Sequence, residues 1–166
     1  MKRKNGVRGL LAILLFVTVI IFTQCSSSKN TTKFDEGELK NMIENKSFKF
    51  VAERTEPLRL KPRYLTSQYD VIVNKDSLIS YLPYFGRAFQ APINPAEGGI
   101  QFTSTDFSYE IEPAKKDSWN VSIKPGDQRD IQKLYFTFFN NGTATLNVTL
   151  TQKDAISFSG RIEKIK

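Results

Sequence analysis

The chain has 166 residues, a formal net charge of +7, no histidine and a single cysteine. Four of its 24 basic residues fall within the first 24 positions, which hold no acid, so the remaining 142 residues carry 20 basic and 17 acidic side chains, a net charge of +3. This balance excludes the strongly basic surface of a nucleic-acid-binding protein. The lack of histidine removes the commonest member of serine triads, zinc sites and acid–base pairs.

Residues 1–24 have the pattern of a bacterial export signal peptide. A basic start is followed by an apolar run of 13 residues, Leu10 to Phe22, and then by Cys25. The run fits the roughly 7–15 residues of a signal sequence and is shorter than the ~20 that cross a bilayer. We predict cleavage before Cys25 and lipidation of its thiol, although Gln24 stands where Gly, Ala or Ser is usual. The weaker alternative is an uncleaved anchor.

This pattern predicts an exported protein, held in the cell envelope by its lipid. The membrane is therefore an expected partner, contacted through Cys25, and the outer membrane facing the periplasm is the expected location. Residues 25–33 are small and polar and would form a flexible tether.

Residues 34–166 are expected to form a single domain. Because this part contains no cysteine, its stability has to come from packing rather than from disulfides. Its first element is predicted to be a short helix from Asp35 to Asn45, with Leu39, Met42 and Ile43 on one face.

From Phe48 onward, apolar and polar residues alternate, as in strands with one buried face. About nine such runs are joined by turn residues, of which Asn140-Asn141-Gly142 is a strong hairpin signal. We predict an all-β fold, an antiparallel meander that closes into a small lipocalin-like barrel or a barrel-type sandwich. The predicted core includes Phe50, Val71, Trp119, Val121, Phe136, Phe138, Leu146 and Phe158.

The stretch from Pro83 to Gly99 breaks this rhythm, because it is rich in proline and glycine yet carries aromatic side chains. Rings there would supply contact area, and Arg87 would pair with an anionic group, so we predict a binding site for a small apolar ligand or an envelope protein. The alternative is that the rings plug one end of the barrel and Arg87 pairs with a nearby acid. The candidate binding residues are Tyr81, Tyr84, Phe85, Arg87 and Phe89.

The acidic side chains make a weaker case for catalysis. Glu110 and Glu112 share one strand face, which is typical of a solvated face, while Asp127 and Asp130 lie in a turn. Together with Asp106 they lack the ligand spacing of a calcium loop, and we predict no catalytic residue, metal ligand or cofactor. A hydrolase with an unrecognised carboxylate site is the alternative to a binding or structural module, which the composition favours.

Three stretches carry a resemblance to a known family: Leu82 to Ala88 (LPYFGRA), Glu97 to Ser104 (EGGIQFTS) and Ile123 to Asp130 (IKPGDQRD). They resemble small lipoproteins of Bacteroidetes-type bacteria catalogued as domain of unknown function 4251. The resemblance covers roughly residues 48–166 and implies a secreted, β-rich domain. It supports lipidation at Cys25, because such proteins often tolerate loose signal boxes, and it supplies no reaction, cofactor or catalytic residue.

One tripeptide at a predicted turn is similar to a glycosylation acceptor. Asp76-Ser77-Leu78 resembles the Asp-Ser/Thr-aliphatic sequence at which bacteria of this group attach sugars to proteins. We therefore predict Ser77 as an O-glycosylation site. The alternative is that Asp76 and Ser77 only close a hairpin.

Overall fold

The computed structural model describes residues 36–89, 98–112, 114–115 and 118–165. The predicted signal peptide, the tether with Cys25, and residues 90–97 of the irregular stretch lie outside them. The described residues belong to a compact unit spanning residues 32–166. Its elements are α2 (Glu36–Glu44), β1 (Phe48–Pro57), β2 (Arg63–Val73), β3 (Leu78–Leu82), β4 (Ile100–Ser104), β5 (Phe107–Glu112), β6 (Ser118–Pro125), β7 (Ile131–Phe139), β8 (Thr143–Leu150) and β9 (Ile156–Glu163).

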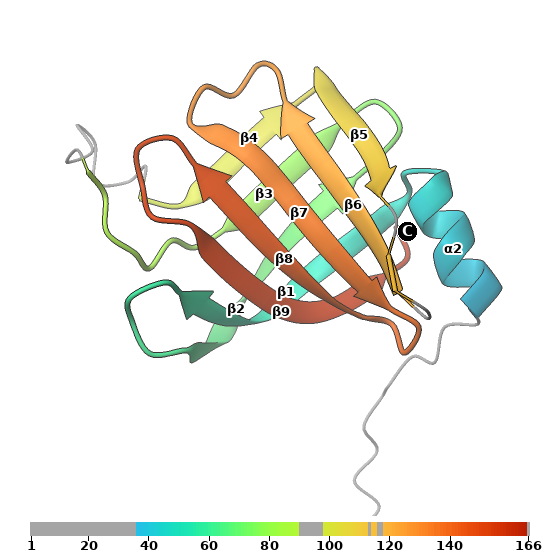
Figure 1. Ribbon diagram of the computed structural model, residues 1–166, viewed down its shortest axis with the longest axis horizontal. Coiled ribbons are helices and arrows are strands. Elements are labelled where there is room, and N and C mark those ends of the chain that lie inside the picture. The colour runs from blue at the N-terminus through green and yellow to red at the C-terminus, as the bar shows by residue number, and fades with distance from the viewer. Residues whose placement is uncertain (1–35, 90–97, 113, 116–117, 166) are drawn as a thin grey trace, which may run out of the picture. The chain divides into compact units, whose positions relative to one another are not determined.

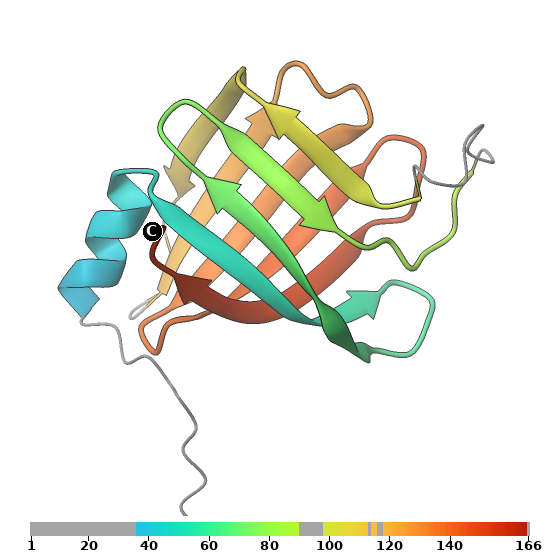
Figure 2. The ribbon, with the colours of Figure 1, turned by 180° about the vertical axis from the view of Figure 1, so that it is seen from behind.

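The nine strands form one antiparallel sheet that curls into a nearly closed barrel (Figures 1 and 2). Strands that follow each other in sequence lie side by side from β1 to β4 and from β5 to β9, and β9 returns to pair with β1. The predicted all-β meander with one short N-terminal helix is confirmed. No helix in the described part of the chain is long and apolar enough to cross a membrane.

The core is built around phenylalanine rings that alternate with outward-facing residues. Phe48 meets Phe136 and Phe138 edge to face, with ring centroids 5.7 and 5.1 Å apart, a favoured aromatic geometry. Seven of the eight predicted core residues are buried. The exception is Trp119, which packs against the core but is only partly buried, because it lies next to the first residue of β6 at one end of the barrel.

The second strand is longer than the sequence pattern predicts. Alternation marks only Tyr69 to Val73, whereas β2 begins at Arg63. Residues 63–68 of β2 are mostly exposed on both faces of the strand. Their sequence therefore lacks the alternation of apolar and polar residues that marks a half-buried strand. The register between β1 and β2 also shifts at this point. Ala52 pairs with Tyr69 but Arg54 pairs with Tyr64, so the four β2 residues between these two tyrosines have no partner in the β1 register.

The sheet ends at β4 and β5, and no ladder joins these two strands among the described residues. A turn links them, and hydrogen bonds hold it to the β6–β7 loop. The Gly126 amide donates to the Asp106 carbonyl over 2.7 Å, and the Thr105 amide donates to the Asp127 carboxylate over 3.2 Å. The barrel is thus tied at one corner rather than along its whole seam.

The helix α2 covers one end of the barrel, where its residues Leu39, Met42 and Ile43 pack into the core. The hydroxyl of the half-buried Tyr109 in β5 donates to the Ile43 carbonyl over 2.7 Å. Because burial disfavours the phenolate, it raises the pKa of Tyr109 well above the ordinary value. The helix therefore caps the end of the barrel opposite the β8–β9 loop (Figure 1).

Candidate functional site

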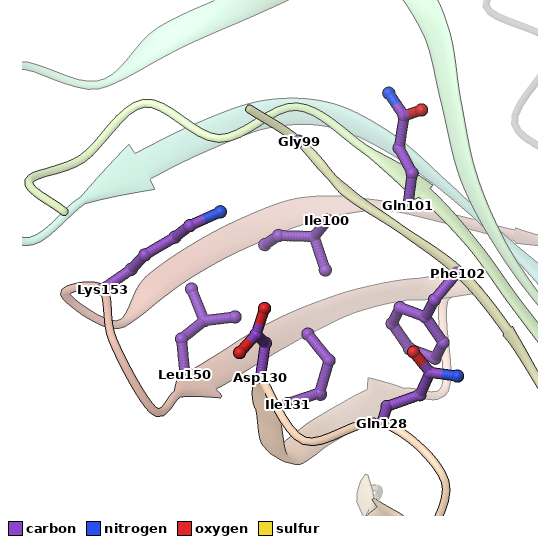
Figure 3. A pocket seen from close by; sticks show the side chains of 9 residues that line it. All are labelled: Gly99, Ile100, Gln101, Phe102, Gln128, Asp130, Ile131, Leu150 and Lys153. Carbon is purple, nitrogen blue, oxygen red and sulfur yellow. The ribbon is translucent and has the colours of Figure 1, made fainter. Parts of the chain in front are cut away.

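A pocket of about 310 Å³ opens at the end of the barrel away from α2. It lies between the start of β4, the β6–β7 loop and the end of β8. Its described lining residues are Gly99, Ile100, Gln101, Phe102, Gln128, Asp130, Ile131, Leu150 and Lys153 (Figure 3). This volume is at the lower end of the range of small-molecule sites.

The floor of the pocket is apolar because strand ends place inward-facing residues there. Ile100 is the first residue of β4, Ile131 the first of β7, and Leu150 the last of β8. All three are buried, with Phe102 half-buried beside them. A ligand that covers this floor would remove apolar surface from water, which favours binding.

The rim of the pocket is polar and carries both charges. Lys153 and Asp130 converge on the space between Ile100 and Leu150, whereas Gln101 points away (Figure 3). The Lys153 ammonium also lies 5.2 Å from the centroid of the Tyr84 ring, a cation–π arrangement that fixes the side chain at the rim. An apolar floor beside the Lys153 ammonium suits a small molecule with an apolar part and an anionic group that lies on the Lys153 side of the rim, away from Asp130.

The structure does not gather the five predicted binding residues into one site. Tyr81 lies on the outer side of the barrel, where its ring stacks on Tyr69 with centroids 5.6 Å apart. Arg87 and Phe89 are exposed, and Phe85 is half-buried with the Arg63 guanidinium 4.7 Å from its ring centroid. None of these residues is among the described residues that line the pocket.

Of the five, Tyr84 joins two segments of the chain through its hydroxyl. The oxygen lies 2.9 Å from the Arg87 carbonyl and 3.0 Å from the Asp154 carbonyl, to which it donates its proton. Burial, with the nearby Asp154 charge, raises the pKa of Tyr84. A Cβ atom at Gly86 would overlap the Tyr84 hydroxyl, so a larger residue there would have to displace the Tyr84 ring from these contacts. Tyr84 therefore holds this segment against the β8–β9 loop beside the pocket.

Two of the five acidic residues considered for catalysis, Glu112 and Asp127, have side-chain partners with a structural role. Hydrogen bonds from the Ser104 hydroxyl and the Thr105 amide lower the pKa of Asp127, which closes the β4–β5 corner. Loss of solvent around the ring, and then the hydrogen bond to Glu112 and the charge of that carboxylate, raise the pKa of Tyr135. Asp130 is the one acid among the described pocket residues, so no carboxylate pair lines this pocket. The described part also holds no cluster of three or more acidic, cysteine or histidine side chains suited to a metal ion.

Ser77, the predicted glycosylation site, lies in the turn between β2 and β3 and is half-buried. Its hydroxyl oxygen accepts a hydrogen bond from the Asn74 amide over 3.0 Å, and its carbonyl accepts from the Asn74 backbone over 2.8 Å. These bonds show that Ser77 helps to close the hairpin. Its glycosylation stays a prediction.

Sequence reasoning missed most of the pocket, above all Lys153, Ile131 and Leu150. Lys153 is one of many lysines in the sequence, and Ile131 and Leu150 lie just outside the alternating runs from Leu134 to Phe138 and from Ala144 to Val148. One available signal was their position, because each lies at or just beyond a predicted strand end, and strand ends meet at the mouths of a barrel. Which mouth stays open depends on where α2 packs.

Comparison with known proteins places the chain among relatives whose function is not assigned. The family described as "Domain of unknown function (DUF4251)" matches residues 30–162. A crystal structure of a DUF4251 family protein from Bacteroides eggerthii DSM 20697 superposes with a TM-score of 0.56 at 16% identity, covering 78% of this chain and 87% of that one. No curated protein matches the sequence significantly. At this identity the structural match shows the fold alone.

Proposed function

We propose that this chain, which belongs to the DUF4251 family, is an exported lipoprotein of the cell envelope whose barrel mouth binds a small amphipathic molecule. The observation that carries the binding proposal is the pocket away from α2, with buried Ile100, Ile131 and Leu150 beneath Lys153. The ligand would place its apolar part on this floor and an anionic group beside the ammonium. The pocket provides a binding geometry and no pair of acids for hydrolysis.

Support for the envelope location comes from the sequence of the first 25 residues. A basic start, a 13-residue apolar run and the lone Cys25 together form an export and lipidation pattern. A thioether-linked diacylglycerol plus a further acyl chain would supply the multiple chains that stable anchoring needs.

Lipidation is tested by expressing the full chain and its Cys25→Ala variant in a related bacterium supplied with labelled palmitate. We expect label and membrane fractionation for the original chain. The variant should remain unprocessed or lose the label. Normal maturation and membrane retention of the variant would contradict lipidation at Cys25.

Ligand binding is tested with 1-anilinonaphthalene-8-sulfonate, which combines apolar rings with an anionic sulfonate. The compact unit begins at Thr32, so a chain from residue 26 onward retains the whole described core. Titration should shift the NMR methyl signals of Ile131 and Leu150 more than that of Val71, which is buried in β2. Equal shifts at all three would reject the pocket as the site.

The role of Lys153 has a matched control in Lys133. Each ammonium lies above a tyrosine ring, at 5.2 and 5.1 Å from the centroid, yet only Lys153 lines the pocket. We expect Lys153→Gln to weaken binding of the sulfonate probe roughly tenfold, because a charge-assisted contact is lost, and Lys133→Gln to leave its Kd unchanged. Equal effects of both variants would contradict an anion site at Lys153.

A further inference from the structure

Three segments of the chain meet around the β8–β9 loop at the open end of the barrel (Figure 1). Arg59 in the β1–β2 loop donates from Nε to the Asp154 carboxylate over 3.1 Å. The amide of Phe89 donates to the Gln152 carbonyl over 2.8 Å, and the amide of Asp154 to the Arg87 carbonyl over 3.0 Å. These bonds fix the β1–β2 loop and the segment after β3 beside each other.

Large apolar side chains project from these joined segments into solvent. Leu58 is 67% exposed, Leu60 52% and Phe89 59%. Apolar side chains brought together at one end of a domain mark a contact surface more often than isolated exposed ones do. We call the following residues the mouth surface: Leu58, Arg59, Leu60, Lys61, Arg87 and Phe89.

The charge of the mouth surface is one-sided. Arg59, Lys61 and Arg87 are exposed cations interleaved with the apolar residues. Across residues 58–62, 86–89 and 151–155 the sequence contains one acid, Asp154, whose side chain is only 8% exposed and is bonded to Arg59. The exposed face therefore combines apolar side chains with positive charge.

We propose that the mouth surface docks on an anionic phospholipid bilayer. Leucine and phenylalanine would enter the boundary between headgroups and acyl chains, while arginine and lysine keep their cationic ends at the phosphates. An acidic protein would satisfy the charges, but Leu58, Leu60 and Phe89 are each more than half exposed, outside the strands, and do not line a groove that a protein anchor would fill. The bilayer is the occupant that fits both features.

The docking surface is argued from the folded domain and does not depend on the lipid at Cys25. If that lipid is present, the ten residues between Cys25 and Glu36 would extend to at most about 35 Å. The tether would join the domain at α2, the end opposite the mouth surface, so docking requires it to run alongside the barrel. Docking would then present the pocket beside the mouth surface to molecules leaving or entering the lipid.

The test uses tryptophan fluorescence of the full chain in vesicles. With Trp119 replaced by phenylalanine, the chain has no other tryptophan, so Leu60→Trp reports on the mouth surface alone. The matched control is Ile111→Trp on β5, because Ile111 is 47% exposed and Leu60 52%. Vesicles contain phosphatidylcholine with brominated acyl chains, with or without anionic phosphatidylglycerol, and the lipid label on Cys25 is measured in each sample.

We expect Leu60→Trp to shift to the blue and to be quenched at least twofold by brominated chains in anionic vesicles, with Ile111→Trp unaffected. Adding Lys61→Glu and Arg87→Glu to the Leu60→Trp chain should abolish the quenching. The control pair, Lys75→Glu and Lys124→Glu, changes two exposed lysines outside the mouth surface and should leave the quenching unchanged. Equal quenching at both tryptophan positions, or none at Leu60→Trp in labelled protein, would overturn the proposal. A blue shift without quenching would indicate a protein partner and would also overturn it.

Discussion

At the residue scale, Gly160 shows how closely two strands can approach. It faces Ala52 across β1 and β9 and Ala144 across β8 and β9, next to the point where the β1 register shifts. A Cβ atom at this position would overlap the Val51 carbonyl oxygen. The bulge in β1 therefore requires a glycine on the neighbouring strand, since backbone atoms cannot move aside as a flexible side chain can.

We predict that Gly160→Ala lowers the free energy of unfolding by about 1–3 kcal/mol, the usual range for overpacking a close contact. Urea denaturation followed by circular dichroism measures this change. The control is Gly37→Ala in the first turn of α2, an exposed position where alanine favours the helix and stability should stay equal or rise. Similar stabilities for the two variants would show that β1 relaxes around the added methyl group.

At the element scale, α2 is fixed to the barrel at its C-terminal turn. Lys46 has a positive φ of 51°, and bonds from Lys46 N to Ile43 O and from Ser47 N to Met42 O close the turn as a Schellman motif. The Lys46 ammonium lies 5.2 Å from the Tyr109 ring centroid, and the Tyr109 hydroxyl binds the Ile43 carbonyl. The helix end and β5 are thus joined by polar contacts beside the apolar ones.

We expect Tyr109→Phe to cost about 1 kcal/mol of the free energy of unfolding, because one part-buried hydrogen bond is lost while the Ile43 carbonyl keeps the Lys46 amide as a donor. Hydrogen exchange should show faster opening of α2 than of β7 and β8. Tyr64→Phe, at a side chain that is 80% exposed, is the control and should leave both measurements unchanged. A loss spread evenly over all strands would mean that Tyr109 supports the core rather than the helix.

At the scale of the whole molecule, the described residues show no strand pairing between the two edge strands, β4 and β5. The barrel is closed instead by contacts at the turn that joins these strands. The Asp127 carboxylate accepts a hydrogen bond from the Thr105 amide, and the Gln128 side-chain amide donates one to the Thr103 carbonyl over 3.2 Å. Both contacts connect the β6–β7 loop to the region where β4 turns into β5. The pocket opens at the seam beside this turn, because Gln128 both bonds to Thr103 and lines the pocket.

Acidification should loosen this corner. Because hydrogen bonds hold the pKa of Asp127 below its ordinary value of 3.8, the carboxylate contributes stability that is present above pH 3.8 and is lost as the pH falls through the lower folded-state pKa. The NMR shift of the Thr105 amide should titrate with a midpoint below 3.8. In Asp127→Asn that titration should be absent. A midpoint at or above 3.8 in the original chain would contradict this assignment.

The alternation of residues within each strand could be predicted from sequence because burial on one face of a strand repeats every second residue. Phe136 and Phe138 show this directly, since both were placed in the core by spacing and both are fully buried. The first part of β2 could not be found in this way because both of its faces are mostly exposed. The Trp119 side chain packs against the core as predicted, but it is only partly buried because it lies near the end of a strand.

The sequence by itself determined the all-β meander, the short N-terminal helix and the family resemblance, because these depend on local periodicity, turn residues and short stretches of chain. Only the tertiary structure decided which residues form the pocket. Ile100, Ile131, Leu150 and Lys153 come from separate strand ends, and their meeting depends on the pairing of β9 with β1 and on the side where α2 packs. Contacts between distant segments are set by the shape of the closed sheet, which no local pattern encodes.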